Sequence, residues 1–444
     1  MDMEEYLQIL LEQIRCRKVR PVIEEEMRGH ILEQAQANRQ KGMDEEEALR
    51  EAVRDMGDPV ETGVSLDRIH RPQMAWGVMF LMGIISIFSI ILQWMISGWT
   101  DAAQGLKYTL RHGAGVVAGY AAMLAVYRFD YSYIGKYAKR IACIFIGVIF
   151  FFVFGFGMTV NGARAWFSLG GMGNISVISL MYLFIPVYGA LLYQYRGEGW
   201  RGIGKSILWM IPPIFLAVRI PCISLALMLF LIMSVMLSVA AGRNWFRVSG
   251  VRFLVTFWSV AAGVPVLVLL TGIRMGYFAS YQTERIRSFL NMETGYRDYA
   301  GELVLQVLEN SKFIGNSGME AAGRIPEMDS SYPLVFLASY CGIAAALLAG
   351  LLLLAVAAKA IQISFGQKNQ LGMMMGCGCG LLLEMLTVTG ILRNCSLIPA
   401  ARIFFPFLST GSTGIIVSYI LIGIVLSIYR YQNLLPAEIR TEHS

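Results

Sequence analysis

Charged residues are scarce in this sequence. Asp, Glu, Lys and Arg make up 15% of its 444 residues, whereas hydrophobic residues make up 56%. Soluble domains of ordinary composition carry about 25% charged residues, so the chain is not expected to be a soluble enzyme. The basic residues lie in short loops between hydrophobic runs and form no basic face on a soluble segment. A protein that binds nucleic acid is therefore also excluded.

Cysteine is too sparse and too scattered for a disulfide framework. The chain has seven cysteines, and most lie in or beside hydrophobic runs, where Cys is a small apolar side chain. Cys377 and Cys379 are close together, but no His or second Cys pair lies near them in the sequence. This spacing argues against a zinc site. Whether a divalent cation takes part in the function stays open.

Long hydrophobic runs are what the sequence has in abundance. A helix that crosses about 30 Å of hydrocarbon needs about 20 apolar residues. The sequence predicts an all-α, polytopic membrane protein of about ten transmembrane helices. The N-terminus is acidic and polar, unlike a cleavable signal peptide, so the first run is expected to act as the insertion signal. The expected spans are 74–97, 113–127, 141–158, 174–193, 203–220, 222–241, 253–273, 333–358, 371–392 and 412–429.

The basic residues mark one side of the membrane. They lie in the loops that follow the second, fourth, sixth and eighth spans, and the opposite loops are poor in Lys and Arg apart from a long segment near 274–332. Since loops rich in Lys and Arg stay in the cytoplasm, we expect both termini to be cytoplasmic. The basic residues are Arg128, Lys136, Lys139, Arg140, Arg196, Arg201, Lys205, Arg243, Arg247, Arg252, Lys359 and Lys368.

Residues 1–72 differ from the rest and predict a small cytoplasmic three-helix domain. Apolar stripes follow Tyr6 and Pro21, and Asp44 with Glu47 has the spacing of a capping box for a third helix that Gly57 ends. The segment resembles the prefix domain ahead of bacterial permeases, which implies regulation or docking. A membrane domain at 73–430 and a cytoplasmic tail at 431–444 complete the expected organisation. The resemblance lies in 42–48, 56–59 and 66–72.

Three polar stretches on the predicted outer face carry the candidate site residues. The first holds Arg164 and Trp166, a pair that suits an anionic lipid headgroup or an ordinary interfacial anchor. The second is the long loop, whose basic residues suit a pyrophosphate and whose Glu327 and Asp329 suit a base. The third, 394–414, holds two prolines and a cluster of Ser, Thr and Gly. It predicts a structured re-entrant element, because backbone freed at membrane depth must be buried or line a cavity.

At these stretches the chain resembles the bacterial shape, elongation, division and sporulation family (FtsW, RodA and SpoVE). Its passages are specific in combination and order, and the resemblance covers nearly everything after residue 74. It implies ten spans, cytoplasmic termini and a large outer loop between the seventh and eighth spans. The closest passages are 129–131, 161–164, 281–291, Pro326-Glu327, 399–412 and 421–427.

The resemblance implies glycosyl transfer at the outer face of a bacterial plasma membrane. The substrate would be lipid II or a similar polyprenyl-linked saccharide, and the partner a class B penicillin-binding protein, beside the membrane lipids. Such a reaction needs a carboxylate to take a hydroxyl proton and cations to hold the leaving pyrophosphate. We expect Asp329 to be the base, with Glu327 as the second carboxylate. The expected substrate contacts are Arg164, Trp166, Arg285, Arg287, Lys312, Arg402, Ser409 and Ser412.

The chain departs from the family at the residue that matters most. The family carries an essential aspartate in a Pro-Glu-x-His-Thr-Asp-Phe passage, and without gaps its position here holds Ser331, while Asp329 stands at the family's His. Two other interpretations therefore stay open. One is a catalytically inactive scaffold or regulator of a penicillin-binding protein, and the other a transporter of lipid-linked precursors. Glu384, inside the ninth span, is a buried polar residue expected to pair with Arg219, Arg393 or Arg402.

Overall fold

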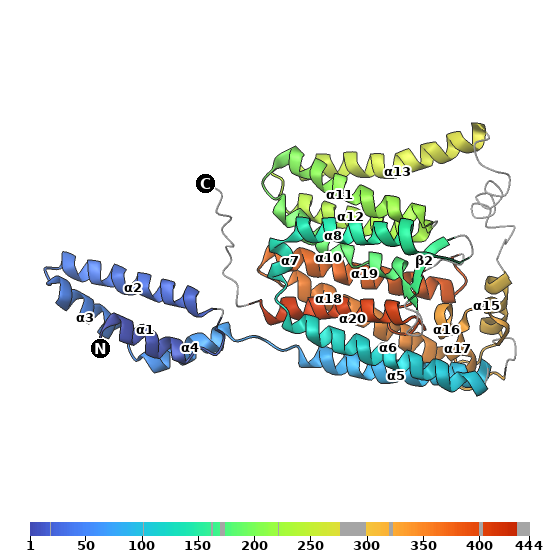
Figure 1. Ribbon diagram of the computed structural model, residues 1–444, viewed down its shortest axis with the longest axis horizontal. Coiled ribbons are helices and arrows are strands. Elements are labelled where there is room, and N and C mark those ends of the chain that lie inside the picture. The colour runs from blue at the N-terminus through green and yellow to red at the C-terminus, as the bar shows by residue number, and fades with distance from the viewer. Residues whose placement is uncertain are drawn as a thin grey trace. The chain divides into compact units, whose positions relative to one another are not determined.

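The computed structural model describes residues 1–17, 19–100, 102–160, 163–168, 174–220, 222–275, 299–318, 323–398 and 403–432. The chain divides into two compact units. One is Met1–Ala75 with Ile428–Ser444, and the other is Trp76–Ser427. Both are built almost entirely of helices (Figure 1).

The N-terminal unit has four helices rather than the three expected: α1 (Met3–Glu12), α2 (Arg20–Gln40), α3 (Glu45–Asp55) and α4 (Pro59–His70). The residues predicted to end α3 also begin α4. Gly57 has φ +75°, and the side chain of Asp58 accepts a hydrogen bond from the amide of Val60 and caps α4. Asp44 does precede α3, but its side chain makes no capping hydrogen bond.

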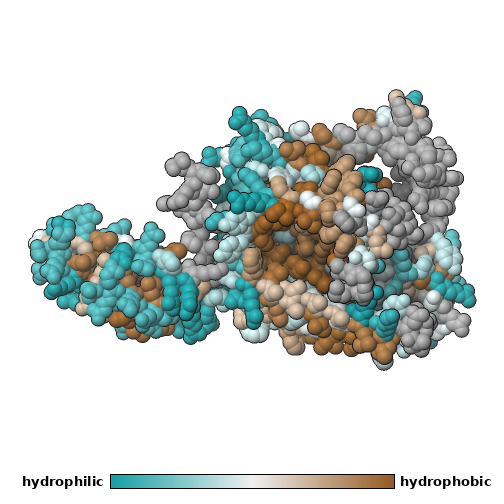
Figure 2. Space-filling model, viewed as in Figure 1, coloured by the Kyte–Doolittle hydropathy of each residue, from teal (hydrophilic) through white to brown (hydrophobic). Residues whose placement is uncertain are grey.

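The fourth helix completes a small core. Gly63 of α4 lies against α1 so closely that a Cβ there would come within 2.6 Å of the Leu10 carbonyl oxygen. The carboxylate of Asp67 accepts a hydrogen bond from the amide of Arg15. Tyr6 and Leu10 of α1 are fully buried as a result. Figure 2 shows that the hydrophilic side chains of this unit face outward.

The larger unit is a bundle of long helices, as the hydrophobic runs predict. Among the described residues, eight helical segments are long and apolar enough to cross a membrane. The other two expected spans correspond to α6, which pairs with α5, and α13, whose residues Gly250–Gly263 are apolar. The long helices are α5 (Trp76–Thr100), α6 (Ala102–Arg128), α8 (Ala138–Phe151), α10 (Phe184–Gln194), α11 (Gly199–Arg219), α12 (Ile223–Gly242), α13 (Gly250–Met275), α18 (Ile343–Phe365), α19 (Gln370–Asn394) and α20 (Ser412–Arg430).

Short elements extend some of these spans. A π-helical turn, η1 (Phe152–Phe156), continues α8, and α9 (Val177–Met181) leads into α10. A short helix, α7 (Ser132–Lys136), follows α6, while α15 (Tyr299–Glu309), α16 (Met328–Ser331) and α17 (Pro333–Tyr340) precede α18. A three-stranded antiparallel sheet joins β1 (Met158–Val160), β2 (Ala163–Ser168) and β3 (Asn174–Ser176).

The prediction that the eighth span, 333–358, is a single helix is wrong. α17 ends at Tyr340, Gly342 has φ +103°, and α18 begins at Ile343. The segment that follows α15 explains the break, because the amide of Ile343 donates to the Lys312 carbonyl oxygen at 3.0 Å. A Cβ at Gly342 would lie 2.6 Å from the Phe313 carbonyl oxygen, so only glycine fits there. α17 is too short to cross a bilayer, and α18 is the span.

The helix α19 lies in the middle of the bundle, between α10 and α18 (Figure 1). Small residues make this close packing possible. A Cβ at Gly380 would come within 2.6 Å of Ile361, and one at Gly378 within 2.7 Å of Met236. Cys377 and Cys379 are fully buried beside these glycines. They therefore serve as small packing residues on a helix that other helices surround.

Candidate functional site

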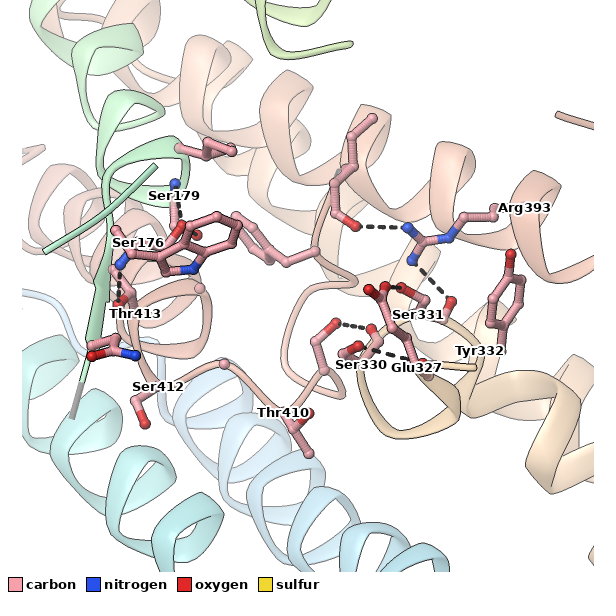
Figure 3. Close-up of a pocket in the computed structure, with 18 of the residues that line it drawn as sticks. Ser176, Ser179, Glu327, Ser330, Ser331, Tyr332, Arg393, Thr410, Ser412 and Thr413 are labelled. Carbon is pink, nitrogen blue, oxygen red and sulfur yellow. Dashed lines mark hydrogen bonds between the residues drawn. The ribbon is translucent and has the colours of Figure 1, made fainter. Parts of the chain in front are cut away.

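A cavity of about 730 Å³ opens where the sheet, the turn before α17 and the segment before α20 meet (Figure 3). Its wall is rich in hydroxyl groups. Among the described residues that line it, Glu327 supplies the carboxylate and Arg393 the guanidinium. The hydroxyl side chains are Ser176, Ser179, Ser330, Ser331, Ser409, Thr410, Ser412, Thr413 and Tyr332.

The turn at α16 presents Glu327 to the cavity. Glu327 has φ +56°, in the left-handed region that costs a non-glycine residue about 1–2 kcal/mol. The turn then lets the hydroxyl of Ser331 donate to the Glu327 carboxylate at 3.1 Å, while the Ser331 amide donates to the Glu327 carbonyl at 2.7 Å. Glu327 and Ser331 therefore meet at the cavity wall (Figure 3).

The C-terminal end of α19 holds this turn in place. Arg393 is buried and donates to the carbonyl oxygens of Ser331 at 2.9 Å and Ile403 at 3.0 Å. Its guanidinium lies 5.6 Å from the centre of the Tyr332 ring and interacts electrostatically with Glu327. Arg393 thus joins the turn to the segment before α20 and places a positive charge near the carboxylate.

Asn394, the next residue, caps the helix that follows the turn. Its side-chain oxygen accepts from the amides of Leu334 and Val335 at 3.1 and 3.2 Å, and its amide donates to the Ser331 carbonyl at 3.1 Å. Amides in the first turn of a helix have no intrahelical partner. Asn394 supplies that partner from another helix, so the start of α17 depends on α19.

The segment before α20 forms the opposite wall. The hydroxyl of Ser409 donates to the Ser330 carbonyl at 2.6 Å and accepts from the Phe405 amide at 2.7 Å. Thr410 donates to the carboxylate of Asp329 at 2.6 Å. Asp329 is absent from the described lining of the cavity. Its carboxylate is used to hold Thr410 rather than to face the cavity.

The sheet supplies the third wall. Trp166 of β2 pairs with Ser176 of β3 and with Met158 of β1. The amide of Ser176 donates to the hydroxyl of Thr413 at 3.0 Å, which ties the sheet to the first turn of α20. Trp166 therefore stands at the edge of the cavity as a half-buried aromatic surface.

The structure brings together four of the residues predicted for the site: Trp166, Glu327, Ser409 and Ser412 line the cavity. Lys312 is exposed and lies outside the described lining. Arg285, Arg287 and Arg402 fall outside the described residues, as does the side chain of Arg164, whose backbone belongs to β2.

Glu384 has none of the expected arginine partners in the described part of the chain. One of its carboxylate oxygens is buried and accepts no hydrogen bond there. Arg393 is nine residues further along the same helix, which corresponds to about 13 Å at 1.5 Å per residue. The separation explains why the two side chains do not meet.

Arg393 and Asn394 are the residues of the site that sequence reasoning misses in these roles. The sequence suggests Arg393 only as a partner of Glu384, and Asn394 only as the start of a broken segment. The one available signal is two adjacent polar residues at the C-terminal end of a hydrophobic run. Most of the carbonyl and amide groups that they bind come from residues about sixty positions earlier, as in the Asn394–Leu334 contact, and no local pattern predicts such pairs.

Comparison with known proteins agrees with this architecture. The profile of the family described as "Cell cycle protein" (FTSW_RODA_SPOVE) matches residues 72–434. The chain is 23% identical to the "Probable peptidoglycan glycosyltransferase FtsW" of Geobacter sp. (strain M18), over 79% of this chain and 95% of that protein. It is also 23% identical to the "Stage V sporulation protein E" of Bacillus subtilis (strain 168), over 80% of this chain and 95% of that protein.

Two solved structures share the fold. One is described as "Structural coordination of polymerization and crosslinking by a peptidoglycan synthase complex", with a TM-score of 0.66 and 19% identity over 81% of this chain and 99% of that chain. The other is the rod shape determining protein RodA of Thermus thermophilus, with a TM-score of 0.54 and 16% identity over 81% of this chain and 97% of that chain.

Proposed function

The chain belongs to the FtsW/RodA/SpoVE family of cell cycle proteins, and on that premise we propose that it is a glycosyltransferase. Its substrate would be lipid II or a similar polyprenyl-linked saccharide, polymerised at the outer face of a bacterial plasma membrane. Relatives are named as probable peptidoglycan glycosyltransferases at 23% identity. That likeness supports the class of reaction, and the cavity supports the assignment of residues.

In the proposed reaction, a sugar hydroxyl of one saccharide attacks the anomeric carbon of another. A new carbon–oxygen bond forms, the bond between the anomeric carbon and the pyrophosphate breaks, and polyprenyl pyrophosphate leaves with the electron pair. The hydroxyl proton passes to a carboxylate of the protein. The protein must therefore present a carboxylate to a cavity that admits a sugar.

The proposal rests on the presence of the Glu327 carboxylate in the cavity wall. It is the carboxylate among the described residues of the lining, and Ser331 holds it by a hydrogen bond of 3.1 Å. Without gaps in the family passage, Ser331 stands at the position of the family's aspartate. Glu327 thus brings an acidic group to the side chain of Ser331, from four residues earlier in the same turn.

Asp329, the base expected from the sequence, fits a supporting role better. Its carboxylate accepts from Thr410 at 2.6 Å, and its carbonyl oxygen accepts from Gln93 of α5 at 2.8 Å and from the Thr410 amide at 3.2 Å. These contacts join α5, α16 and the segment before α20. We assign the base to Glu327 and the stabilisation of the cavity wall to Asp329.

Polymerisation of lipid II by the purified chain tests this function. We expect Glu327→Gln to lower the rate by at least about 100-fold, the usual contribution of a general base, while Glu309→Gln on the exposed end of α15 leaves it unchanged. Asp329→Asn should lower the rate less than Glu327→Gln does. Full activity of Glu327→Gln, or inactivity of the wild-type chain with lipid II under every metal condition, would contradict the proposal.

A scaffold for a penicillin-binding protein is the second candidate, and Ser331 in place of the family's aspartate favours it. One solved structure with this fold comes from a peptidoglycan synthase complex, which supports a partner of that kind for either function. Co-purification of a penicillin-binding protein with a wild-type chain that forms no glycan would establish the scaffold. With both termini in the cytoplasm, as the loop charges predict, the cavity faces outward in either case.

A further inference from the structure

The turn α16, which presents the proposed base, is held by its carbonyl groups. The last carbonyl oxygens of a helix have no partner within the helix, and other elements bind those of the last three residues of α16. Residues of α19 donate to the oxygen of Ser331, and Ser409 donates to that of Ser330 at 2.6 Å. Gln93 of α5 donates to the oxygen of Asp329 at 2.8 Å. The position of the base therefore depends on three separate parts of the fold.

The side chain of Gln93 also binds the opposite wall of the cavity. The nitrogen that donates to Asp329 donates to the Leu408 carbonyl oxygen as well, at 2.7 Å. A side-chain amide nitrogen has two hydrogens, so Gln93 uses one for each wall. Both partners are carbonyl oxygens, which only accept, so the nitrogen must face them. Gln93 is fully buried, and its own oxygen accepts no hydrogen bond from the described residues.

The same face of α5 holds the backbone next to Leu408. Phe407 has φ +63°, in the left-handed region that large side chains rarely adopt. Ser89, one turn before Gln93, donates from its hydroxyl to the Phe407 carbonyl oxygen at 2.5 Å. Two consecutive carbonyl groups of the wall thus bind α5. Since α5 is a long helix of the bundle, it gives this strained segment a fixed position.

Gln93 is the counterpart of Arg393 on the other side of the turn. Arg393 bridges the two walls from α19, through the carbonyl oxygens of Ser331 and Ile403, whereas Gln93 bridges them from α5. The direct contacts between the walls, such as Ser409 with α16, join two short segments and do not fix either to the bundle. Gln93 and Arg393 do so, one from each side.

We propose that Gln93 is a positioning residue: its two hydrogen bonds fix the turn that carries Glu327 against the segment before α20. This proposal rests on the proposed function. Gln93 is absent from the described lining of the cavity, so it acts on the reaction through Glu327. A displacement of a reacting group by about 1 Å is enough to slow a reaction about 100-fold.

The variant Gln93→Met removes both hydrogen bonds and keeps an unbranched side chain of similar length. Because Arg393 still holds the other side of the turn, we expect kcat for lipid II polymerisation to fall about tenfold, with KM changed less than about twofold. Gln362→Met, the same chemical change at an exposed position of α18, is the matched control and should behave as wild type. Rates are compared per folded chain, as measured by size-exclusion chromatography in detergent.

Gln93→Glu is the milder variant. A carboxyl group buried in this position stays neutral and has one hydrogen to donate, so it can bind one wall but not both. We expect its kcat to lie between those of wild type and Gln93→Met. It carries the same comparison if Gln93→Met does not fold.

Combination with Glu327→Gln tests the route of the effect. If Gln93 acts through Glu327, the double variant Gln93→Met/Glu327→Gln should be no slower than Glu327→Gln alone, since a carboxylate that is missing cannot be misplaced. A role in stability alone would lower both rates by the same factor. Wild-type kcat for folded Gln93→Met would overturn the proposal, and so would effects of the two substitutions that multiply in the double variant.

Hydrogen exchange gives a readout that needs no reaction. Gln93→Met should reduce the protection of the amides in 330–332 and 408–410, and Gln362→Met should not. A wild-type chain that forms no glycan, but loses this protection in Gln93→Met, would refute the proposed function and retain the bridge between the walls. An active wild-type chain with a slow Glu327→Gln variant, but with normal kcat and protection in Gln93→Met, would retain the proposed function and refute the role of Gln93.

Discussion

The hydroxyl of Ser331 lies 3.1 Å from the carboxylate of Glu327, to which it donates a hydrogen bond across one turn of backbone. The left-handed conformation of Glu327 makes this contact possible by folding the carboxylate back over α16. The serine that stands at the family's aspartate position without gaps therefore has a carboxylate beside it. The first two predictions follow from this relationship.

Ser331→Ala should slow polymerisation modestly. The variant removes one hydrogen bond that orients the base, worth about 1 kcal/mol, or about fivefold in rate. Ser330→Ala is the matched control, because its hydroxyl donates to the backbone oxygen of Glu327, at 3.3 Å, and not to the carboxylate. Initial rates of glycan formation for the two variants give the comparison. Equal rates for both would show that Ser331 does not orient Glu327.

Ser331→Asp should restore activity to a chain that carries Glu327→Gln. The double variant places the carboxylate on α16 itself, where the family has it, and the glutamine amide introduced by Glu327→Gln can then donate to it. We expect the double variant to be at least about tenfold faster than Glu327→Gln alone, since a general base contributes about 100-fold or more. A double variant as slow as the single one would argue that the acidic group must come from position 327.

Asn394→Leu should destabilise the protein. The variant leaves the amides of Leu334 and Val335 buried without an acceptor, and each unsatisfied group costs about 1–3 kcal/mol. Asn310→Ala, which removes an exposed contact with Gln306, is the control. Thermal unfolding of the purified chain in detergent should show a clearly lower melting temperature for Asn394→Leu and little change for Asn310→Ala. An unchanged melting temperature for Asn394→Leu would contradict the capping role.

Gly390→Ala should displace Phe405 and, with it, the segment before α20 that forms one wall of the cavity. A Cβ at Gly390 would lie 1.8 Å from the Phe405 ring, and Phe405 is fully buried, so the ring must move. Overpacking of this kind typically costs about 1–3 kcal/mol, and we expect both melting temperature and activity to fall. Gly147→Ala, with open space around its Cβ position, should leave both unchanged or raise stability. Retention of full activity by Gly390→Ala would show that the wall tolerates displacement.

The N-terminal unit should lose stability in acid. Arg28 donates to the Glu4 carboxylate and holds the pKa of Glu4 below its ordinary value of 4.5. A carboxyl group with a lowered pKa in the folded state stabilises the fold above its unfolded pKa and loses that contribution as the pH falls through its folded pKa. Hydrogen exchange of α1 and α2 in the full-length chain, corrected for the intrinsic rate, should therefore rise below pH 4.5.

Arg28→Met provides the check on this pH dependence. We expect the variant to exchange faster than wild type at neutral pH and to approach it in acid, where Glu4 is protonated in both. Arg17→Met, at an exposed position, is the control and should follow wild type throughout. A difference between Arg28→Met and wild type that persists unchanged below the folded pKa would exclude the Glu4 contact as its cause.

Local patterns in the sequence determined the membrane architecture. Burial of a hydrophobic run in a bilayer needs only length and composition, so the spans and the helical class were predictable before any contact was known. The family was recognised separately, from the resemblance of passages such as Pro326-Glu327 and 399–412. The same holds for Trp166, Ser409 and Ser412, which stand in polar stretches that packing does not explain. Two predictions failed because the local pattern fits more than one structure. Gly57–Pro59 ends α3 but also begins α4, and the hydrophobic run through Gly342 forms two helices rather than one.

Only the tertiary structure decided which position each residue takes at the cavity. Glu327 and Asp329 are two residues apart in the sequence, yet the left-handed turn directs the first to the cavity and Thr410 holds the second in the wall. Arg393, Asn394 and Gln93 act on carbonyl and amide groups far away in the chain. Such contacts depend on the positions of whole helices, because a hydrogen bond requires its two atoms to lie within about 3 Å of each other. Sequence periodicity specifies which face of a helix is buried, but not which distant group meets it there.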